Sequence, residues 1–175
     1  MTGSNLPATQ PLEPGVDHVR GDPAGRLILI YGDYECPYTR RAYREVEQVE
    51  SSLDGGMRFA FRHFPLEDKH PHAFAASAAT EAVALQGRFW EMHDLLFHRQ
   101  KALADDDLRG YGADLALDPD RFDRDRASAA VRARVHRDVR LGADSGVRGT
   151  PAIFIDGAAW RGSYEAAVLL AELDA

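Results

Sequence analysis

The sequence is poor in cysteine, with Cys36 alone among its 175 residues. A single cysteine excludes an internal disulfide, so no disulfide framework stabilises the fold. The first residues, Met1 to Pro7, contain neither a basic stretch nor an apolar one, and no signal peptide is evident there. Together these absences predict a protein of the reducing cytoplasm.

Positive charge and long apolar runs are also scarce. The chain has 21 Lys and Arg against 28 Asp and Glu, which gives a net charge of -7 at pH 7. This balance argues against nucleic acid as a partner, because phosphate binding needs a basic surface, and against adsorption to acidic lipid headgroups. No apolar run approaches the roughly 20 residues that span a bilayer. We therefore expect neither a nucleic-acid partner nor a membrane association.

The remaining composition is typical of a globular domain, since 45% of the residues are hydrophobic and 28% are charged. Proline, glycine and aspartate are frequent before residue 26, and no periodicity is sustained there. This pattern predicts a flexible arm over residues 1–14 and an irregular lead-in over residues 15–25.

Two strands joined by a helix are predicted next. Residues 27–31 form a short apolar run that is typical of a buried central strand. Pro37 suits the first position of a helix, and apolar residues then recur at helical spacing as far as Leu53. Residues 57–64 alternate between two faces, which predicts a second strand. Two strands joined by a helix imply a parallel pair with a right-handed crossover.

Residues 65–145 have almost no strand character and predict a helical insertion. Its expected helices cover residues 71–86, 88–102, 105–115 and 119–141. Beyond it, residues 151–155 and 158–161 predict a hairpin around the turn Asp156-Gly157, followed by a last helix. The sequence thus predicts an α/β fold in which a sheet domain, residues 15–64 and 146–175, carries an all-helical subdomain.

Cys36 lies directly after the first predicted strand and opens the first predicted helix. The unpaired amide hydrogens and the partial positive charge of a helix N-terminus stabilise a thiolate over a thiol. Because the thiolate is the attacking species in disulfide exchange, this position predicts a reactive cysteine. The alternative is a buried structural cysteine, since free cysteine is among the most buried residue types.

Several segments of the chain form a combined pattern around this cysteine. They are Tyr31–Tyr38, Phe61–Leu66, His70–Ala73, Phe89–Leu96 and Gly146–Ile155. Together they resemble the DsbA-like proteins of the thioredoxin fold, in particular the bacterial subgroup also found fused to sodium/proton antiporters. The resemblance covers about Asp17 to Leu173 in the right order. It implies a thioredoxin-like fold interrupted by a helical domain, in agreement with the predicted order of strands and helices.

The resemblance also implies roles for individual residues. Cys36 would be the nucleophile, and Thr150-Pro151 would be the cis-proline loop that faces it. In such folds the backbone before the proline pairs with an extended substrate. Thr150 and Pro151 are therefore expected to bind the substrate, together with Pro37 and Tyr38.

Thr39 departs from the family, whose usual motif has a second cysteine at this position. A dithiol resolves its mixed disulfide internally, whereas a monothiol must be released by an external thiol. The resemblance and this departure together predict a monothiol thiol–disulfide oxidoreductase whose catalytic residues are Cys36 and Thr39. Two roles are open for Thr39, a hydrogen bond from its hydroxyl to the Cys36 thiolate or a bond to local backbone amides.

Such an enzyme would act on protein or small-molecule disulfides and thiols. Glutathione, mycothiol or a related thiol would be its co-substrate, and no cofactor would be tightly bound. Two other functions remain open, a redox-inactive module that binds a peptide or a thiol, and a transferase resembling the kappa-class glutathione transferases. Seven histidines are present, but the spacings His70–His72 and His93–His98 match no strong zinc pattern, so no metal site is expected.

Overall fold

The computed structural model describes residues 8–174. Within them, five strands form one sheet in the order β1-β3-β2-β4-β5. The strands are β1 (His18–Gly21), β2 (Leu27–Gly32), β3 (Arg58–His63), β4 (Ala152–Ile155) and β5 (Ala158–Ala159). β2 and β3 pair in parallel, as the helix between them predicts. β1 runs antiparallel to β3, and β4 runs antiparallel to both β2 and β5.

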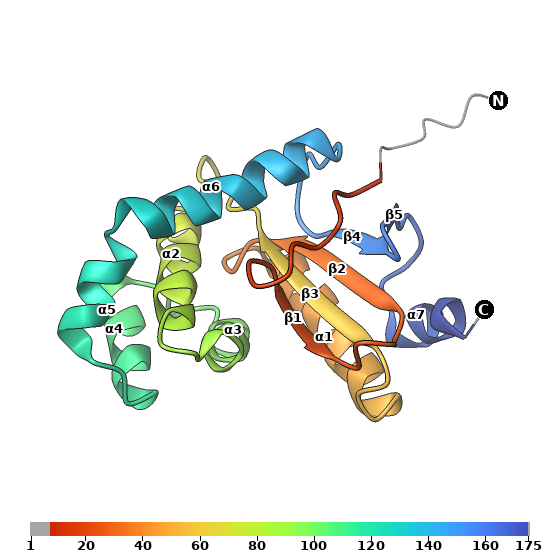
Figure 1. The fold of residues 1–175 in the computed structure, drawn as a ribbon, viewed down its shortest axis with the longest axis horizontal. Coiled ribbons are helices and arrows are strands. Elements are labelled where there is room, and N and C mark those ends of the chain that lie inside the picture. Colours follow the sequence, from red (N-terminus) through yellow and green to blue (C-terminus); the bar gives the residue numbers. More distant parts are fainter. Residues whose placement is uncertain (1–7, 175) are drawn as a thin grey trace.

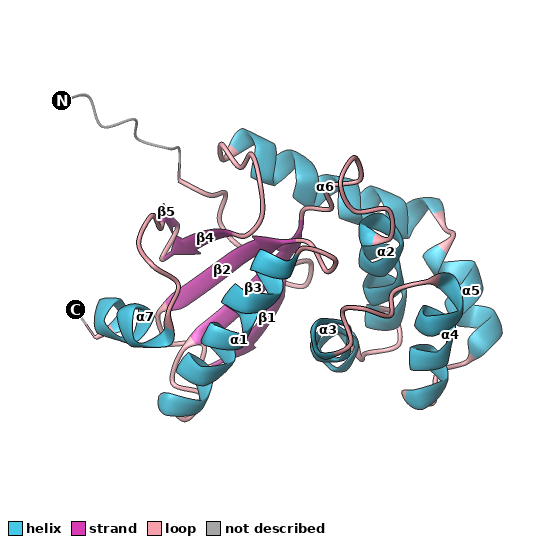
Figure 2. Ribbon diagram, turned by 180° about the vertical axis from the view of Figure 1, so that it is seen from behind, coloured by secondary structure: helices cyan, strands magenta, loops and turns pink. Residues whose placement is uncertain are grey.

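Two helices, α1 (Pro37–Ser52) and α7 (Ala166–Leu173), pack on the face of the sheet that is turned to the viewer in Figure 2. The others follow one another between β3 and β4: α2 (Ala73–Ala84), α3 (Phe89–His98), α4 (Asp105–Asp114), α5 (Pro119–Arg126) and α6 (Ala129–Asp144). They lie beside the sheet within the predicted insertion, and α6 runs back toward the sheet (Figure 1). In the described part of the chain, no helix is long and apolar enough to cross a membrane.

β2 is buried along its whole length, and its side chains alternate between two apolar clusters. Ile28 and Ile30 belong to the cluster on the side of α1 and α7. Leu29 and Tyr31 belong to a second cluster on the opposite face, with Ala60, Val147 and Phe154. A strand that is covered on both faces needs an apolar residue at every position, which is what residues 27–31 provide.

The N-terminal region differs from the sequence prediction at two places. His18–Gly21 is an edge strand and not part of an irregular lead-in, because its pairing depends on the neighbouring β3 and not on a local apolar pattern. Residues 8–14 do not form a flexible arm. The Thr9 amide donates to the Gly157 carbonyl at 3.0 Å, and the Thr9 hydroxyl lies 3.0 Å from the Tyr31 hydroxyl. The rest of the predicted arm, residues 1–7, lies outside the described residues.

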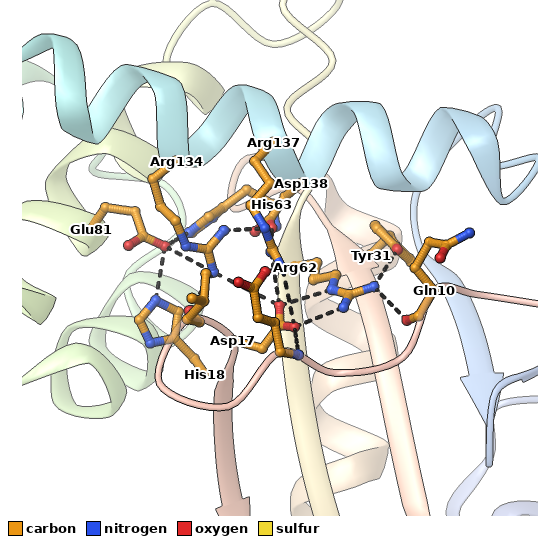
Figure 3. A network of polar contacts seen from close by, with 12 residues as sticks. Gln10, Asp17, His18, Tyr31, Arg62, His63, Glu81, Arg134, Arg137 and Asp138 are labelled. Carbon is orange, nitrogen blue, oxygen red and sulfur yellow. Dashed lines mark hydrogen bonds and ion pairs between the residues drawn. The ribbon is translucent and has the colours of Figure 1, made fainter.

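Arg62 of β3 holds this N-terminal segment against the sheet (Figure 3). Its side chain is wholly buried. The guanidinium donates to the Asp17 carboxylate at 2.7 and 2.9 Å and to the Tyr31 hydroxyl at 2.8 Å. It also donates to the carbonyl oxygens of Gln10 and Pro11, both at 3.0 Å. A buried guanidinium needs such acceptors, so the segment before β1 is a fixed part of the fold.

The single helix predicted over residues 119–141 is in fact two helices, α5 and α6. Ser128 separates them, and its hydroxyl caps α6 by accepting a hydrogen bond from the Val131 amide at 3.2 Å. The preceding helix begins as expected at Asp118, whose carboxylate accepts from the Arg121 amide at 2.7 Å. A serine N-cap satisfies amide hydrogens that would otherwise remain unpaired, and it thereby lets the chain change direction inside a continuous helical pattern.

Candidate active site

Cys36 lies where the chain passes from β2 into α1, as the sequence predicts. The turn between them is closed by a hydrogen bond from the Cys36 amide to the Asp33 carbonyl at 3.1 Å. Pro37 occupies the first turn of α1, where a missing amide hydrogen costs nothing. Gly32 is required before the turn, because a Cβ there would lie 2.5 Å from a ring carbon of Phe61. The sulfur is therefore held at the end of a buried strand and at a helix N-terminus.

The Asp33 carboxylate ties this turn to the segment that follows β3. One of its oxygens accepts from the Glu35 amide at 2.8 Å. The other accepts from the Leu66 amide at 2.8 Å and lies 2.7 Å from His70 Nδ1. The Asp33 side chain is wholly buried, so these contacts replace its hydration. Sequence reasoning did not single out Asp33, because one acidic residue in a turn forms no pattern.

The sulfur of Cys36 faces the loop before β4. Its thiol donates a hydrogen bond to the Thr150 carbonyl oxygen at 3.4 Å, and the Thr150–Pro151 peptide bond is cis. Cys36 is only 3% exposed, and among the described residues no amide of α1 is capped by its sulfur. The structure thus combines the helix N-terminal position expected of a reactive cysteine with the burial expected of a structural one.

Thr39 lies on the inner side of α1 and is wholly buried. Its hydroxyl oxygen accepts a hydrogen bond from the Asp33 amide at 3.4 Å. Its methyl group packs against Gly32, where a Cβ would lie 2.7 Å from Thr39 Cγ2. Of the two roles open for Thr39, the structure shows the bond to a local backbone amide. The bond to the Cys36 thiolate stays a prediction.

The other residues expected to bind substrate are Pro37 and Tyr38, which directly follow Cys36 in the chain, and Pro151. Pro37 and Tyr38 are exposed, Tyr38 with 64% of its surface. Pro151 lines a cavity of about 280 Å³. Other residues in the wall of this cavity are Arg148, Phe154, Trp160 and Tyr164. Thr150 therefore contacts the Cys36 sulfur, and the next residue, Pro151, belongs to the wall of a cavity.

Two residues of the insertion contact the same turn. His93 of α3 has its Nδ1 2.8 Å from the Tyr34 hydroxyl, and both side chains are wholly buried. Burial, reinforced by the positive charge of Arg20, lowers the pKa of His93 well below its ordinary value. Burial also raises the pKa of Tyr34 well above its ordinary value, so both groups are neutral. Gln100 follows the end of α3 and donates to the backbone of the turn.

Sequence reasoning weighed His93 as a metal ligand and, from the family resemblance, favoured a structural or helix-capping role for it, but it passed over Gln100. The sequence carries no signal for either contact, because each depends on how the insertion packs against the sheet. These contacts join residues that are far apart in the sequence. Tyr34 and His93 are separated by 59 positions, and Cys36 and Gln100 by 64. Local periodicity reports only which face of a helix is buried.

Three buried residues, His63, Glu81 and Asp138, lie close enough together to be considered as metal ligands. Glu81 is 2.8 Å from His63 Nε2 and 2.9 Å from His18 Nε2. Arg134 donates to Asp138 and lies 3.8 Å from Glu81. This arginine opposes binding of a cation, and the group forms an ion-pair network between the sheet and α2 and α6 (Figure 3). The expected absence of a metal site stays a prediction.

Curated relatives align with nearly the whole chain. It is 39% identical over 173 residues to the Na(+)/H(+) antiporter NhaA 1 of Mycolicibacterium gilvum. It is 40% identical over 166 residues to the Na(+)/H(+) antiporter NhaA of Herminiimonas arsenicoxydans, and 43% over 163 residues to NhaA 1 of Salinispora arenicola. These alignments cover 97%, 94% and 92% of this chain but only 28%, 26% and 25% of those proteins. The chain thus spans about a quarter of the length of these relatives.

Solved structures share the fold. A thioredoxin-like oxidoreductase from Silicibacter pomeroyi DSS-3 has a TM-score of 0.78 at 25% identity, and the match covers 91% of each chain. Oxidised BdbD from Bacillus subtilis has a TM-score of 0.80 at 17% identity, and the match covers 98% of this chain and 97% of that one. The predicted thioredoxin-like α/β fold with a helical insertion is therefore confirmed.

The DSBA-like thioredoxin domain family matches residues 27–174. This range begins with β2 and ends just after α7, so it includes the turn with Cys36, the whole insertion and the Thr150–Pro151 loop. The resemblance seen in the sequence segments is confirmed by this match and by the relatives that are about 40% identical. The chain belongs to the family of DSBA-like thioredoxin domains.

Proposed function

We propose that this chain is a monothiol thiol–disulfide oxidoreductase with Cys36 as its nucleophile. The Cys36 thiolate attacks one sulfur of a substrate disulfide, and the second sulfur leaves as a thiolate that takes up the proton released by Cys36. A small thiol such as glutathione then attacks the mixed disulfide, restores the Cys36 thiolate and leaves as a mixed disulfide with the substrate. One disulfide is exchanged for another, so the cycle needs no further oxidant or reductant.

One observation carries this proposal. The only cysteine of the chain stands at the N-terminus of α1 with its sulfur 3.4 Å from the Thr150 carbonyl of the cis-proline loop. Thr39 stands where a second cysteine would resolve the mixed disulfide, and a hydroxyl forms no disulfide. Its oxygen is also engaged with the Asp33 amide. Release of Cys36 therefore depends on an external thiol.

The Thr150 carbonyl also offers a place for the substrate backbone. When Cys36 loses its proton, the sulfur no longer donates to this oxygen. The oxygen is then free to accept an amide hydrogen from an extended chain, a form of strand addition. In this arrangement Pro37 and Tyr38 contact the substrate near the sulfur, and the cavity lined by Pro151 receives one of its side chains. The proposed cycle uses no tightly bound cofactor.

The mixed disulfide itself provides the test. We expect the reduced protein, mixed with a peptide disulfide, to gain the mass of one peptide half at Cys36 and to keep it until glutathione is added. Intact-mass spectrometry follows both steps. Cys36→Ser should gain no mass under the same conditions. Efficient reduction of insulin by the natural chain without any added monothiol would contradict the proposal.

The two other functions that the sequence leaves open predict different results. A redox-inactive module would bind a cysteine-free peptide but form no mixed disulfide at Cys36. A glutathione transferase would conjugate glutathione to an electrophile and would not capture a peptide disulfide. Either result would replace the proposal. As proposed, the partners are protein or small-molecule disulfides and thiols in the cytoplasm, and neither nucleic acid nor a membrane takes part.

A further inference from the structure

Gln100 reaches from the helical insertion to the backbone of the active-site turn. Its side-chain nitrogen Nε2 lies 2.7 Å from the Tyr34 carbonyl oxygen and 2.9 Å from the Cys36 carbonyl oxygen. A primary amide nitrogen carries two hydrogens, so both of its donors are directed to this turn. The two carbonyl groups on either side of Glu35 are therefore held by one nitrogen atom.

The Cys36 carbonyl is also the point at which α1 begins. It accepts the Arg40 amide at 3.1 Å, the first hydrogen bond of the helix. A second donor on the same oxygen fixes the orientation of the peptide group that follows Cys36. The Cα atom of Cys36 belongs to that peptide group. The direction of the Cα–Cβ bond, and with it the position of the sulfur beside Thr150, therefore depends on the Gln100 contact.

The same turn is held by α3 at a second point, but in a different way. His93 bonds to the hydroxyl at the tip of the Tyr34 side chain, whereas Gln100 bonds to the Tyr34 backbone. The His93 contact fixes a buried ring that packs against Phe61 of β3 and Phe97 of α3. The Gln100 contact is half-buried and acts directly on the peptide groups next to the sulfur. Of these two residues of the insertion, only Gln100 therefore bonds to the backbone from which Cys36 projects.

We propose that Gln100 is a positioning residue for Cys36. Its two donors hold the turn so that the sulfur meets an incoming disulfide in line, while the substrate backbone lies at Thr150. This inference rests on the proposed function for its kinetic consequence. Its structural consequence, a turn fixed by the insertion, stands independently of any reaction.

Two substitutions separate the donors from the size of the side chain. Gln100→Glu keeps the shape but, when ionised, presents oxygens to two carbonyl oxygens. Gln100→Leu removes both donors and keeps a side chain of similar bulk. Gln48→Glu is the matched control, because Gln48 is exposed on α1 and the charge change is the same. Circular dichroism and urea unfolding establish that each variant is folded before rates are compared.

The rates of two reactions of Cys36, disulfide capture and alkylation, are compared at one pH, because the two reactions have different geometric requirements. Capture of a peptide disulfide needs an oriented sulfur, whereas alkylation by iodoacetamide needs only an accessible thiolate. We expect both Gln100 variants to capture the peptide about tenfold more slowly or worse, because small misplacements of reacting atoms are costly. Alkylation should stay within about threefold, since it has no such need for orientation. Gln48→Glu should change neither rate.

The pH dependence of the capture defect distinguishes the loss of the two donors from general damage to the structure. A protonated carboxyl group has one O–H donor, so the defect of Gln100→Glu should shrink as the pH falls toward about 4, the ordinary range of a glutamate. Gln100→Leu has no group to protonate, and its defect should stay constant. The rate of peptide capture is divided by the rate of alkylation for each chain. If both folded Gln100 variants give the same ratio as the natural chain, the proposal is overturned.

Amide hydrogen exchange separates this inference from the proposed function. In both Gln100 variants, exchange at Arg40 should become faster than in the natural chain, because its acceptor at Cys36 is less firmly held. If exchange rises but the natural chain captures no disulfide, the proposed function fails and the positioning of the turn stands. If exchange and the rate ratio are both unchanged, the role of Gln100 is wrong whatever the function.

Discussion

The thiol of Cys36 donates a hydrogen bond to the carbonyl oxygen of Thr150 across 114 positions of the sequence. Only the protonated sulfur makes this bond, because a carbonyl oxygen repels a thiolate. Ionisation of Cys36 and release of the Thr150 oxygen therefore occur together. The nucleophile and the acceptor proposed for the substrate backbone become available in the same event.

Removal of the thiol should strengthen non-covalent binding of a peptide. In Cys36→Ala the Thr150 oxygen has no intramolecular partner to give up when a substrate amide approaches. We expect a cysteine-free extended peptide to bind Cys36→Ala about two- to tenfold more tightly than the reduced natural chain, since a net hydrogen bond is worth about 0.5–1.5 kcal/mol. Fluorescence anisotropy measures the difference. Weaker binding by Cys36→Ala would show that the peptide does not use this oxygen.

Thr39→Val should reveal what the buried hydroxyl does. Valine keeps the shape but leaves the Asp33 amide without the acceptor it has in the natural chain. We expect the free energy of unfolding to fall by about 1–3 kcal/mol, measured by urea denaturation, while capture of a peptide disulfide by the folded variant changes little. Thr39→Ser, which keeps the hydroxyl, is the control. A large loss of capture in Thr39→Val alone would instead assign the hydroxyl to the Cys36 thiolate.

Thr39→Cys should create a dithiol site. Residues 36 and 39 are neighbours on the first turn of α1, where side chains three positions apart face each other. A second thiol there would attack the mixed disulfide and release the substrate without glutathione. Insulin reduction should then rise, and the mixed disulfide should become short-lived in intact-mass spectra. A mixed disulfide that persists as long as in the natural chain would mean that this position does not reach the sulfur.

Asp17 should make the fold sensitive to acid. Burial opposes ionisation of Asp17, but hydrogen bonds from Arg62 and Arg137 outweigh it and hold its pKa well below the ordinary value. A carboxyl group with a lowered folded pKa contributes stability above its unfolded pKa of about 3.9, and this contribution is lost as the pH falls through the folded value. We therefore expect the free energy of unfolding to decline below about pH 4.

Asp17→Asn isolates this contribution. The side chains of Asp17 and Arg62 are 1% and 0% exposed, so the variant leaves a buried guanidinium without its charge partner. We expect it to be less stable at pH 7 by about 3–5 kcal/mol and to lose less stability on acidification. Asp68→Asn, at an exposed position, should leave the unfolding curve unchanged. An equal acid response in the natural chain and Asp17→Asn would refute this account.

His93 should add a second dependence on pH at milder acidity. Its pKa is well below the ordinary value in the folded state, so only the unfolded chain takes up its proton as the pH falls below about 6.5. The folded state then loses up to about 1.4 kcal/mol per pH unit. His93→Asn keeps an acceptor for the Tyr34 hydroxyl but cannot be protonated. Its stability should fall less than that of the natural chain between pH 7 and 5, as followed by urea unfolding; parallel curves would exclude the effect.

Local patterns in the sequence predicted most of the elements because each pattern reports on its own neighbourhood. Residues 27–31 are apolar at every position and form a strand buried on both faces. The Asp156-Gly157 turn has φ values of 46° and 86°, the left-handed backbone that such a pair favours in a hairpin. The strand His18–Gly21 was missed because its short polar sequence acquires its structure from pairing with β3.

By itself the sequence determined that the chain has one thiol, that this thiol follows a strand and begins a helix, and that no second cysteine can resolve its mixed disulfide. The family resemblance predicted that Thr150 faces Cys36, whereas only the tertiary structure decided that Arg62 is buried against Asp17 and that Gln100 reaches the active-site turn. The physical reason is that periodicity and capping are properties of a few consecutive residues. Hydrogen bonds between residues far apart in the sequence depend on how the sheet, the N-terminal segment and the insertion pack together.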